Sequence, residues 1–146
     1  MPLYGWNDEE VYYVADRAHS LFLQGRYREA GAILEGLVII DPASRYCANA
    51  LAACWLKLGD PQRAVDCLDR LLARYPDDAE GRIRRCEAYL ELRRIGDANN
   101  DLSYLRRVVS AGKASAETRA HTRRLELRIQ AAHAGYLEAP AALPGR

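Results

Sequence analysis

The sequence predicts an all-α fold in which pairs of helices stack one behind another. The stretches "LFLQGRYREAGAILEGLVIIDP" (21–42) and "LKLGDPQRAVDCLDRLLARYP" (56–76) repeat each other when their glycines are aligned. Gly25 then aligns with Gly59 and Pro42 with Pro76, both at one common offset. That offset, roughly 34 residues, is typical of arrays of helical hairpins. The chain also contains no Asn-Gly or Asp-Gly dipeptide, the strongest short signal for a β-hairpin.

Helix start and stop signals divide the chain into seven predicted helices. Short polar side chains accept hydrogen bonds from the free N–H groups at a helix start. We expect this role for Asn7 or Asp8, Ser44, Asp60 and Asp77. Glycine ends a helix in the left-handed conformation, and proline disfavours helix for the residue before it. Together these signals predict helices over about residues 8–24, 27–40, 45–58, 61–74, 78–93, 95–110 and 116–137.

Small and apolar residues recur at matching positions of the predicted pairs. A small residue is needed where two helices of one pair cross, since a larger side chain would separate them. Small residues that could serve this purpose recur at the common offset, at Ala18, Ala52 and Cys86 and at Ala30, Ala64 and Ala98. Leucines at equivalent second-helix positions are expected to fill the seam: Leu34, Leu37, Leu68, Leu71, Leu102 and Leu105. The sequence therefore predicts a continuous apolar core that runs through the stack.

The C-terminal part of the chain is predicted to close this stack. The last helix carries one apolar stripe, with members three or four residues apart: Thr122, Leu125, Ile129, Ala132 and Tyr136. Such a helix can cover the apolar face of a terminal repeat. We therefore expect one domain over residues 1–138, with repeats at about 11–44, 45–78 and 79–112. The capping helix covers 116–137, and a disordered tail follows at 139–146.

Composition and charge exclude several classes of partner and compartment. The net charge of +1 argues against a general affinity for nucleic acid or for an anionic membrane. No apolar run reaches the roughly 18–20 residues that a membrane helix needs. The start of the chain, "MPLYGWNDEE", lacks the basic and apolar regions of a secretory signal, so we expect a cytoplasmic protein. Four cysteines are expected to be small buried residues, with a disulfide or metal role as the alternative: Cys47, Cys54, Cys67 and Cys86.

The chain shows none of the common catalytic motifs. A phosphate-binding loop, a dinucleotide fingerprint, a nucleophile elbow and a zinc-protease motif are all missing from the sequence. Three histidines lie far apart along the chain: His19, His121 and His133. We therefore expect no enzymatic activity, no cofactor and no metal. Arginines cluster at Arg82, Arg84 and Arg85 and at Arg119, Arg123, Arg124 and Arg128. A solvated helix face is favoured for them over an anionic protein partner or nucleic acid.

The repeated positions resemble those of the tetratricopeptide repeat. At the small, glycine, aromatic, alanine and proline positions of that family, the first repeat supplies Ala18, Gly25, Tyr27, Ala30 and Pro42. The second supplies Ala52, Gly59, Pro61 in place of the aromatic residue, Ala64 and Pro76. The third keeps Cys86 and Ala98 but has Arg93 and Ser110 at the glycine and proline positions. This resemblance implies a right-handed superhelix of three helix-turn-helix pairs plus the capping helix.

In such superhelices the first helix of each pair lines a concave groove. The positions expected to bind a peptide there are Tyr12, His19, Phe22, Tyr46, Asn49, Leu56, Ile83 and Leu90. Most of these side chains are apolar or aromatic, which suits an extended peptide with hydrophobic anchor residues. The alternative for any one of them is packing inside its own repeat. The sequence therefore predicts a groove for a protein segment as the functional surface.

The chain also resembles a class of tetratricopeptide chaperones that hold translocator proteins before type III secretion (class II secretion chaperones). The stretches "YCANALAACWLKLGDPQRAVDCL" (46–68) and "RCEAYLEL" (85–92) resemble their second and third repeats, although Cys86 and Glu87 are exchanged and a glycine is absent. The resemblance implies a cytoplasmic monomer or homodimer. Its groove would bind an unfolded translocator-like client segment and keep the client soluble and unassembled. The alternative is a scaffold or adaptor subunit of a secretion or regulatory complex without chaperone activity.

Overall fold

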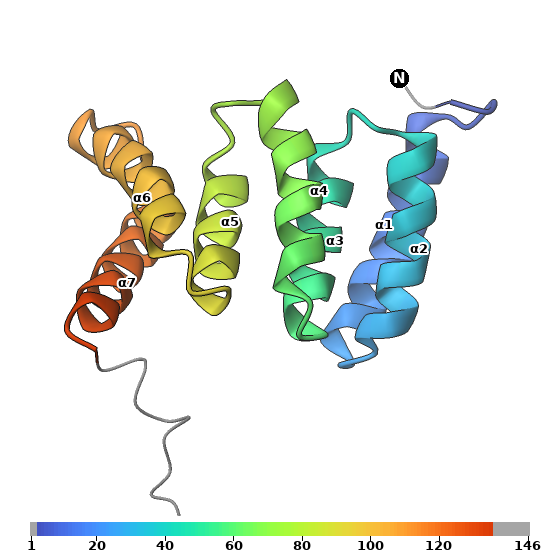
Figure 1. Ribbon diagram of the computed structural model, residues 1–146. Helices are drawn as coiled ribbons and strands as arrows, with labels where there is room; N and C mark the ends of the chain where they lie inside the picture. Colours follow the sequence, from blue (N-terminus) through green and yellow to red (C-terminus); the bar gives the residue numbers. More distant parts are fainter. Residues whose placement is uncertain (1–2, 136–146) are drawn as a thin grey trace, which may run out of the picture.

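The computed structural model describes residues 3–135, which form seven helices and no strand. The helices are α1 (Asp8–Leu23), α2 (Tyr27–Ile40), α3 (Arg45–Lys57), α4 (Pro61–Arg74), α5 (Ala79–Glu91), α6 (Ile95–Ser110) and α7 (Ala116–His133). Consecutive helices pack against each other, and they follow one another along the molecule from α1 to α7 (Figure 1). The predicted all-α class and the order of three hairpins plus a last helix are confirmed. None of the helices in this part of the chain is long and apolar enough to cross a membrane.

The helix caps explain why the elements begin where the sequence predicts. Asn7 and Glu10 form a reciprocal pair: the Glu10 N–H donates to Asn7 Oδ1 at 2.9 Å, and the Asn7 N–H donates to Glu10 Oε2 at 2.8 Å. Ser44 and Asp60 cap α3 and α4 in the expected way. The turn inside each of the first two hairpins contains a glycine with a φ of +76°, which a residue without Cβ adopts at little cost.

Two predicted boundaries of α5 are wrong. Asp78, not Asp77, caps the helix: its Oδ1 accepts the Gly81 N–H at 2.7 Å. Asp78 stands one full repeat after Ser44, so the repeat period itself marks the capping position. The helix also ends at Glu91 instead of Arg93. Arg93 occupies the position of the two turn glycines and adopts the same left-handed conformation, with a φ of +61°. For a residue with a Cβ this costs about 1–2 kcal/mol.

The last helix is shorter than predicted. It ends at His133, because Gly135 follows with a φ of +79° and breaks the helical path. The stripe on this helix is buried as expected, at Thr122, Leu125, Ile129 and Ala132. It packs against α5 and α6, so α7 closes the open end of the third pair. Tyr136 and the predicted tail at 139–146 lie outside the described residues.

The core follows the predicted positions closely. All six small crossing residues have 0% exposed surface, and the six seam leucines are at most 5% exposed. The four cysteines are buried as well, and their thiols add to this apolar core. Cys86 also donates a hydrogen bond to the backbone carbonyl of Ala98 at 3.3 Å, which joins α5 to α6. One apolar cluster therefore reaches from α1 to α7.

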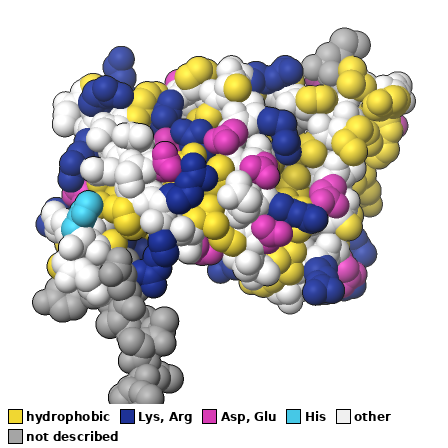
Figure 2. All heavy atoms as spheres, viewed as in Figure 1, with side chains coloured by type: hydrophobic (Ala, Val, Ile, Leu, Met, Phe, Trp, Pro, Cys, Tyr) yellow, Lys and Arg dark blue, Asp and Glu magenta, His cyan; other side chains and the backbone are white. Residues whose placement is uncertain are grey.

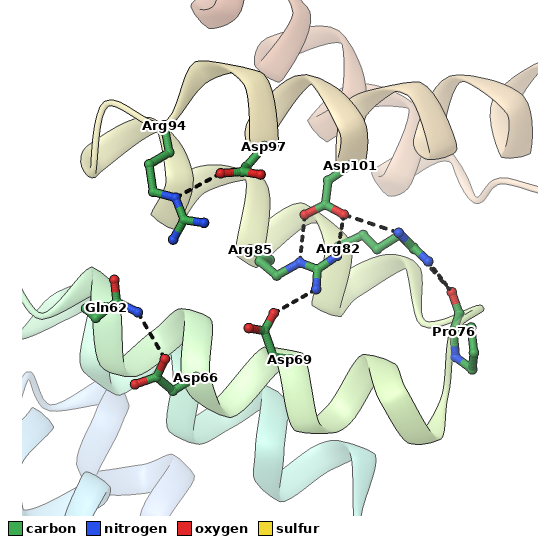
Figure 3. A network of polar contacts seen from close by, with 9 residues as sticks. All are labelled: Gln62, Asp66, Asp69, Pro76, Arg82, Arg85, Arg94, Asp97 and Asp101. Carbon is green, nitrogen blue, oxygen red and sulfur yellow. Dashed lines mark hydrogen bonds and ion pairs between the residues drawn. The ribbon is translucent and has the colours of Figure 1, made fainter.

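A buried carboxylate on α6 joins the two helices of the third pair, α5 and α6. Asp101 on α6 is 1% exposed and accepts hydrogen bonds from two arginines of α5 (Figure 3). Arg85 donates to both of its oxygens, at 2.7 and 2.8 Å, and Arg82 donates to one at 3.2 Å. Arg85 also reaches Asp69 of α4 at 2.8 Å. The expectation of a solvated face is therefore wrong for Arg82 and Arg85, whereas the four arginines of α7 are exposed.

Candidate peptide-binding groove

A cavity of about 250 Å³ opens on the side of the stack that is formed by α1, α3 and α5. It is lined by Ala18, His19, Phe22 and Leu23 of α1, Leu34 of α2, Tyr46, Asn49, Ala50 and Ala53 of α3, and Glu80 and Arg84 of α5. Three successive first helices therefore build one cavity. Four of the eight predicted site residues meet there: His19, Phe22, Tyr46 and Asn49.

The apolar wall of the cavity combines buried and exposed side chains. Phe22 is half-buried and packs edge-to-face on Tyr27, with ring centroids 5.0 Å apart. This contact with the first residue of α2 fixes the orientation of the Phe22 ring. Leu23 and Tyr46 are 72% and 50% exposed. Partial burial, followed by the nearby charges of Cys47, Asp16, Tyr12 and Glu80, raises the pKa of the Tyr46 phenol, which therefore stays protonated at neutral pH. This wall offers apolar surface to an occupant.

Asn49 contributes a buried polar group to the same cavity. The residue is 4% exposed, and its Nδ2 donates to Asp78 Oδ1 at 3.2 Å. Because a carboxylate only accepts hydrogen bonds, the amide nitrogen must face Asp78 and the amide oxygen must face away from it. That oxygen, Oδ1, is buried and has no hydrogen-bond partner among the described residues. An unsatisfied buried acceptor of this kind costs about 1–3 kcal/mol.

Arg84 faces the same cavity from α5 with an unused donor. Its Nη2 donates to Glu80 Oε1, one helical turn earlier, and this pair lies at the surface with Glu80 59% exposed. The Nε atom is buried and, within residues 3–135, finds no acceptor. Two of the residues that line the cavity thus hold a buried acceptor and a buried donor, each without a partner among the described residues.

The other four predicted residues lie outside this cavity. Tyr12 is 73% exposed on α1, and Leu56 is half-buried against the core. Ile83 and Leu90 are 7% and 5% exposed and belong to the core, the place that the alternative interpretation assigns to such residues. Ile83 also lines a second, more polar cavity of about 520 Å³ between α5 and α7, which shares Glu80 and Arg84 with the first.

Sequence reasoning missed Arg84 as a residue of the cavity, because it placed this arginine on a solvated helix face. Leu23 and Glu80 also line the cavity, and both stand at groove-facing positions that the repeat register predicts for the first helices. Glu80 and Arg84 are spaced by four residues on α5, which places them on one helix face. Their spacing alone, however, does not show that this face meets α3.

Comparison with known proteins identifies the repeat. Residues 21–85 match a family model described as tetratricopeptide repeat. The structure of PcrH from Pseudomonas aeruginosa in complex with the chaperone-binding region of PopD superposes with a TM-score of 0.79 at 17% identity, covering 90% of this chain and 97% of PcrH. The Yersinia enterocolitica type III secretion chaperone SycD with a peptide of the translocator YopD gives 0.78 at 14% identity, covering 88% and 95%.

A third solved structure carries the same architecture with a different peptide. The first tetratricopeptide domain of Spaghetti (RPAP3), bound to an HSP90 peptide, gives a TM-score of 0.70 at 18% identity, and the match covers 85% of this chain and 96% of that domain. At these identities the structures show the shared fold. Residues 21–85 thus match the tetratricopeptide repeat, and the fold of the chain resembles that of the type III secretion translocator chaperones.

Proposed function

We propose that this protein binds an extended segment of a translocator-like client along the groove of α1, α3 and α5. The observation that carries the proposal is the cavity there, which combines an apolar wall with unsatisfied hydrogen-bonding groups at Asn49 and Arg84. An extended peptide carries the same combination, because each residue offers a side chain, an N–H and a C=O. The folds that this chain resembles include chaperones crystallised with segments of PopD and YopD, which supports the choice of client.

The mechanism is holding. An apolar side chain of the client fills the cavity against Phe22, Leu23 and Tyr46, which removes it from water and from other client molecules. Ordering an unfolded segment costs conformational entropy, so the affinity per buried area is modest and the segment can be released. The chain supplies a surface and needs no chemical step.

A co-expression experiment separates this function from that of an adaptor. The chain is produced in a bacterial host together with each translocator encoded in its source genome, and the soluble yield of the translocator is measured. A holding chaperone raises that yield, and Tyr46→Glu or Leu23→Glu in the cavity wall abolishes the increase. The matched control is Leu127→Glu on α7, which adds the same charge at a site 50% exposed, as Tyr46 is.

Two results contradict the proposal. An unchanged translocator yield with the wild-type chain, despite a stable complex, would instead support the adaptor role. An increase that survives both Tyr46→Glu and Leu23→Glu would place the client on another surface. Circular dichroism of each variant shows whether the helices are retained.

We also propose that the chain forms a homodimer through its N-terminal end. Four large apolar side chains there are well exposed: Leu3 at 48%, Tyr4 at 76%, Tyr13 at 77% and Ile39 at 61%. Figure 2 shows hydrophobic side chains gathered at this end of the molecule. A solved structure of SycD is described as an alternative dimer, which supports self-association in this fold. Light scattering should give twice the monomer mass for the wild type, and the monomer mass for Tyr13→Glu.

A further inference from the structure

We infer that a cavity between the first two helix pairs binds an aromatic side chain of a partner protein, together with a carboxylate beside it. This α2–α4 cavity has a volume of about 240 Å³. Its wall includes Val38 of α2, Ala48 of α3, and Cys67, Arg70, Leu71 and Arg74 of α4. The wall is separate from that of the groove cavity, so the inference goes beyond the proposed function, which assigns the client segment to the groove.

The protein itself fills the equivalent place in the next repeat. Four residues of the cavity have counterparts one full repeat later: Pro42, Ala48, Cys67 and Arg70 match Pro76, Arg82, Asp101 and Tyr104. At the later place Arg82 donates to the Pro76 carbonyl oxygen at 3.0 and 3.1 Å and to Asp101 at 3.2 Å (Figure 3). Its guanidinium carbon also lies 3.9 Å from the centroid of the Tyr104 ring. Ala48 has no long side chain of this kind, so the equivalent place between α2, α3 and α4 is left open.

The two places differ in charge. Asp101 is a buried carboxylate, whereas its counterpart Cys67 is a neutral thiol at pH 7, because burial raises the pKa of that thiol to about 11. Arg70 stands where Tyr104 has a neutral ring, and none of the described residues that line the α2–α4 cavity carries a carboxylate. A guanidinium placed as that of Arg82 is would therefore meet a like charge and find no anion. The cavity excludes a cationic side chain and suits a neutral or anionic group.

An aromatic ring fits the shape and the chemistry of this cavity. Val38 and the buried Leu71 offer apolar contacts, and the exposed Arg70 offers a guanidinium on which a ring can stack. The Arg82–Tyr104 pair shows such stacking at the equivalent place of the next repeat. In the α2–α4 cavity the roles are exchanged, because this chain supplies the guanidinium and the partner supplies the ring.

The two arginines of the cavity call for a carboxylate beside that ring. Arg70 and Arg74 are one helical turn apart, both are exposed, and neither forms an ion pair within residues 3–135. Asp69, which precedes Arg70, accepts a hydrogen bond from Arg85 of α5 instead. An Asp or Glu of the partner can therefore pair with the two arginines without a competitor. A protein segment is favoured over an anionic membrane because the net charge of the whole chain is only +1.

The test uses peptides that are selected for this cavity alone. A random dodecapeptide library displayed on phage is selected on the immobilised wild-type chain in the presence of excess soluble Ala48→Met. This variant fills the cavity with a flexible apolar side chain and captures phage that bind elsewhere, the groove included. Fluorescence anisotropy then measures the affinity of the tightest labelled peptide for each variant. The matched control is Arg28→Gln, which removes an exposed arginine of α2 outside the cavity.

The selected peptides should share an aromatic residue next to an Asp or Glu. The wild type, Arg28→Gln and the groove variant Tyr46→Glu should bind equally, and Ala48→Met should bind about tenfold more weakly or worse. Arg74→Gln should weaken binding about threefold. Changing the acidic residue of the peptide to its amide should cost the wild type about threefold and should cost Arg74→Gln nothing further.

Arg70→Gln tests the same site if Ala48→Met does not fold. It removes the stacking cation at an exposed position, serves as the soluble competitor in place of Ala48→Met, and should weaken binding about fivefold. Circular dichroism of each variant shows whether the helices are retained.

Four results would overturn the inference. They are the absence of any peptide that survives the competition, surviving peptides that lack the aromatic and acidic pair, loss of binding in Tyr46→Glu, and displacement of the peptide by phosphatidylserine vesicles, which would make a membrane the occupant. A dimer that Ala48→Met converts to a monomer would likewise identify a second copy of this chain as the occupant. Because Tyr46→Glu tests the groove and Ala48→Met tests the cavity, the two proposals can fail separately.

Discussion

Two arginines that are adjacent in the sequence occupy opposite situations in this protein. Arg85 donates three hydrogen bonds, two to the buried Asp101 and one to Asp69, and its side chain is 18% exposed. Arg84 donates one, to the exposed Glu80, and its buried Nε has no acceptor in the described part of the chain. On α5, therefore, Arg85 has hydrogen-bond partners on α4 and α6. Arg84, which lines the groove, keeps a buried donor without an acceptor among the described residues.

This contrast separates residues that hold the fold from residues available to a partner. The hydrogen bonds that Arg85 donates to Asp101 raise the pKa of the Arg85 guanidinium, so Arg85 keeps its positive charge. Around Asp101, every ion is therefore paired inside the molecule. Around Asn49 and Arg84, folding leaves polar atoms without partners, and natural proteins tolerate this cost mainly where a ligand can remove it.

The largest effect should follow from removing Asp101. Asp101→Ala leaves Arg82 and Arg85 partly buried without their shared carboxylate, which should lower the free energy of unfolding by about 3–5 kcal/mol. Urea unfolding followed by circular dichroism measures this change. Asp97→Ala is the matched control, because the Asp97–Arg94 pair is 43% and 46% exposed and should contribute less than about 1 kcal/mol. Equal effects of the two substitutions would show that the Asp101 cluster does not stabilise the fold.

An apolar residue beside Asp101 should also contribute more to the free energy of unfolding than an apolar residue of the cavity wall. Leu102 is 1% exposed next to Asp101, so Leu102→Ala should cost about 2–5 kcal/mol. Tyr46 in the cavity wall is 50% exposed, and Tyr46→Ala should cost about 1 kcal/mol or less, because half of its surface already meets water. The same urea titration gives both values. A loss for Tyr46→Ala as large as that for Leu102→Ala would make Tyr46 a core residue and remove it from the groove.

The fold could be predicted from the sequence because its signals are local and repeated. The repeat period fixes the small crossing positions, and short polar caps fix most of the helix starts. The errors arise where the third repeat departs from the others. Arg93 replaces the turn glycine but keeps the left-handed conformation, and Asp77 and Asp78 are two neighbouring caps of which only the repeat register selects the second.

The polar clusters could be predicted only in part, because they depend on contacts between helices. Asp101 lies three residues after Ala98 and four before Leu105, inside the buried stripe of α6, so its burial had a sequence signal. The arginines that pair with it come 16 and 19 residues earlier and carry no signal of their own. Similarly, Asn49 was predicted as a groove residue. That its side-chain oxygen has no partner among the described residues could not be predicted, because this depends on Asp78, the cap of α5, which accepts from the amide nitrogen.

A third effect concerns Cys86, a fully buried residue that follows Arg85 on α5. Burial, followed by the charges of Asp101 and Glu87, raises the pKa of its thiol to about 12. An unfolded thiol titrates near pH 9, so the unfolded state loses its proton first. The contribution of this thiol to the free energy of unfolding is fully present below pH 9. It decreases by about 1 kcal/mol per pH unit as the pH rises from 9 toward 12.

Urea unfolding at pH 8 and pH 10 tests this linkage. Between the two values the wild type should lose about 1 kcal/mol more than Cys86→Ala, which has no thiol to titrate at this position. An identical loss in the two proteins would show that the thiol titrates in the folded protein as it does in the unfolded chain.

The smallest expected change in stability belongs to Asn49→Leu. The substitution loses the hydrogen bond to Asp78, worth about 1 kcal/mol, but it also removes the buried oxygen that has no partner. Asp78 keeps its bond to the Gly81 N–H and its ion pair with Arg45, so no charge is left isolated. The free energy of unfolding should therefore stay within about 1 kcal/mol of the wild-type value. A loss close to that of Asp101→Ala would mean that Asn49 serves the fold as Asp101 does, and the distinction between the two sides of α5 would no longer hold.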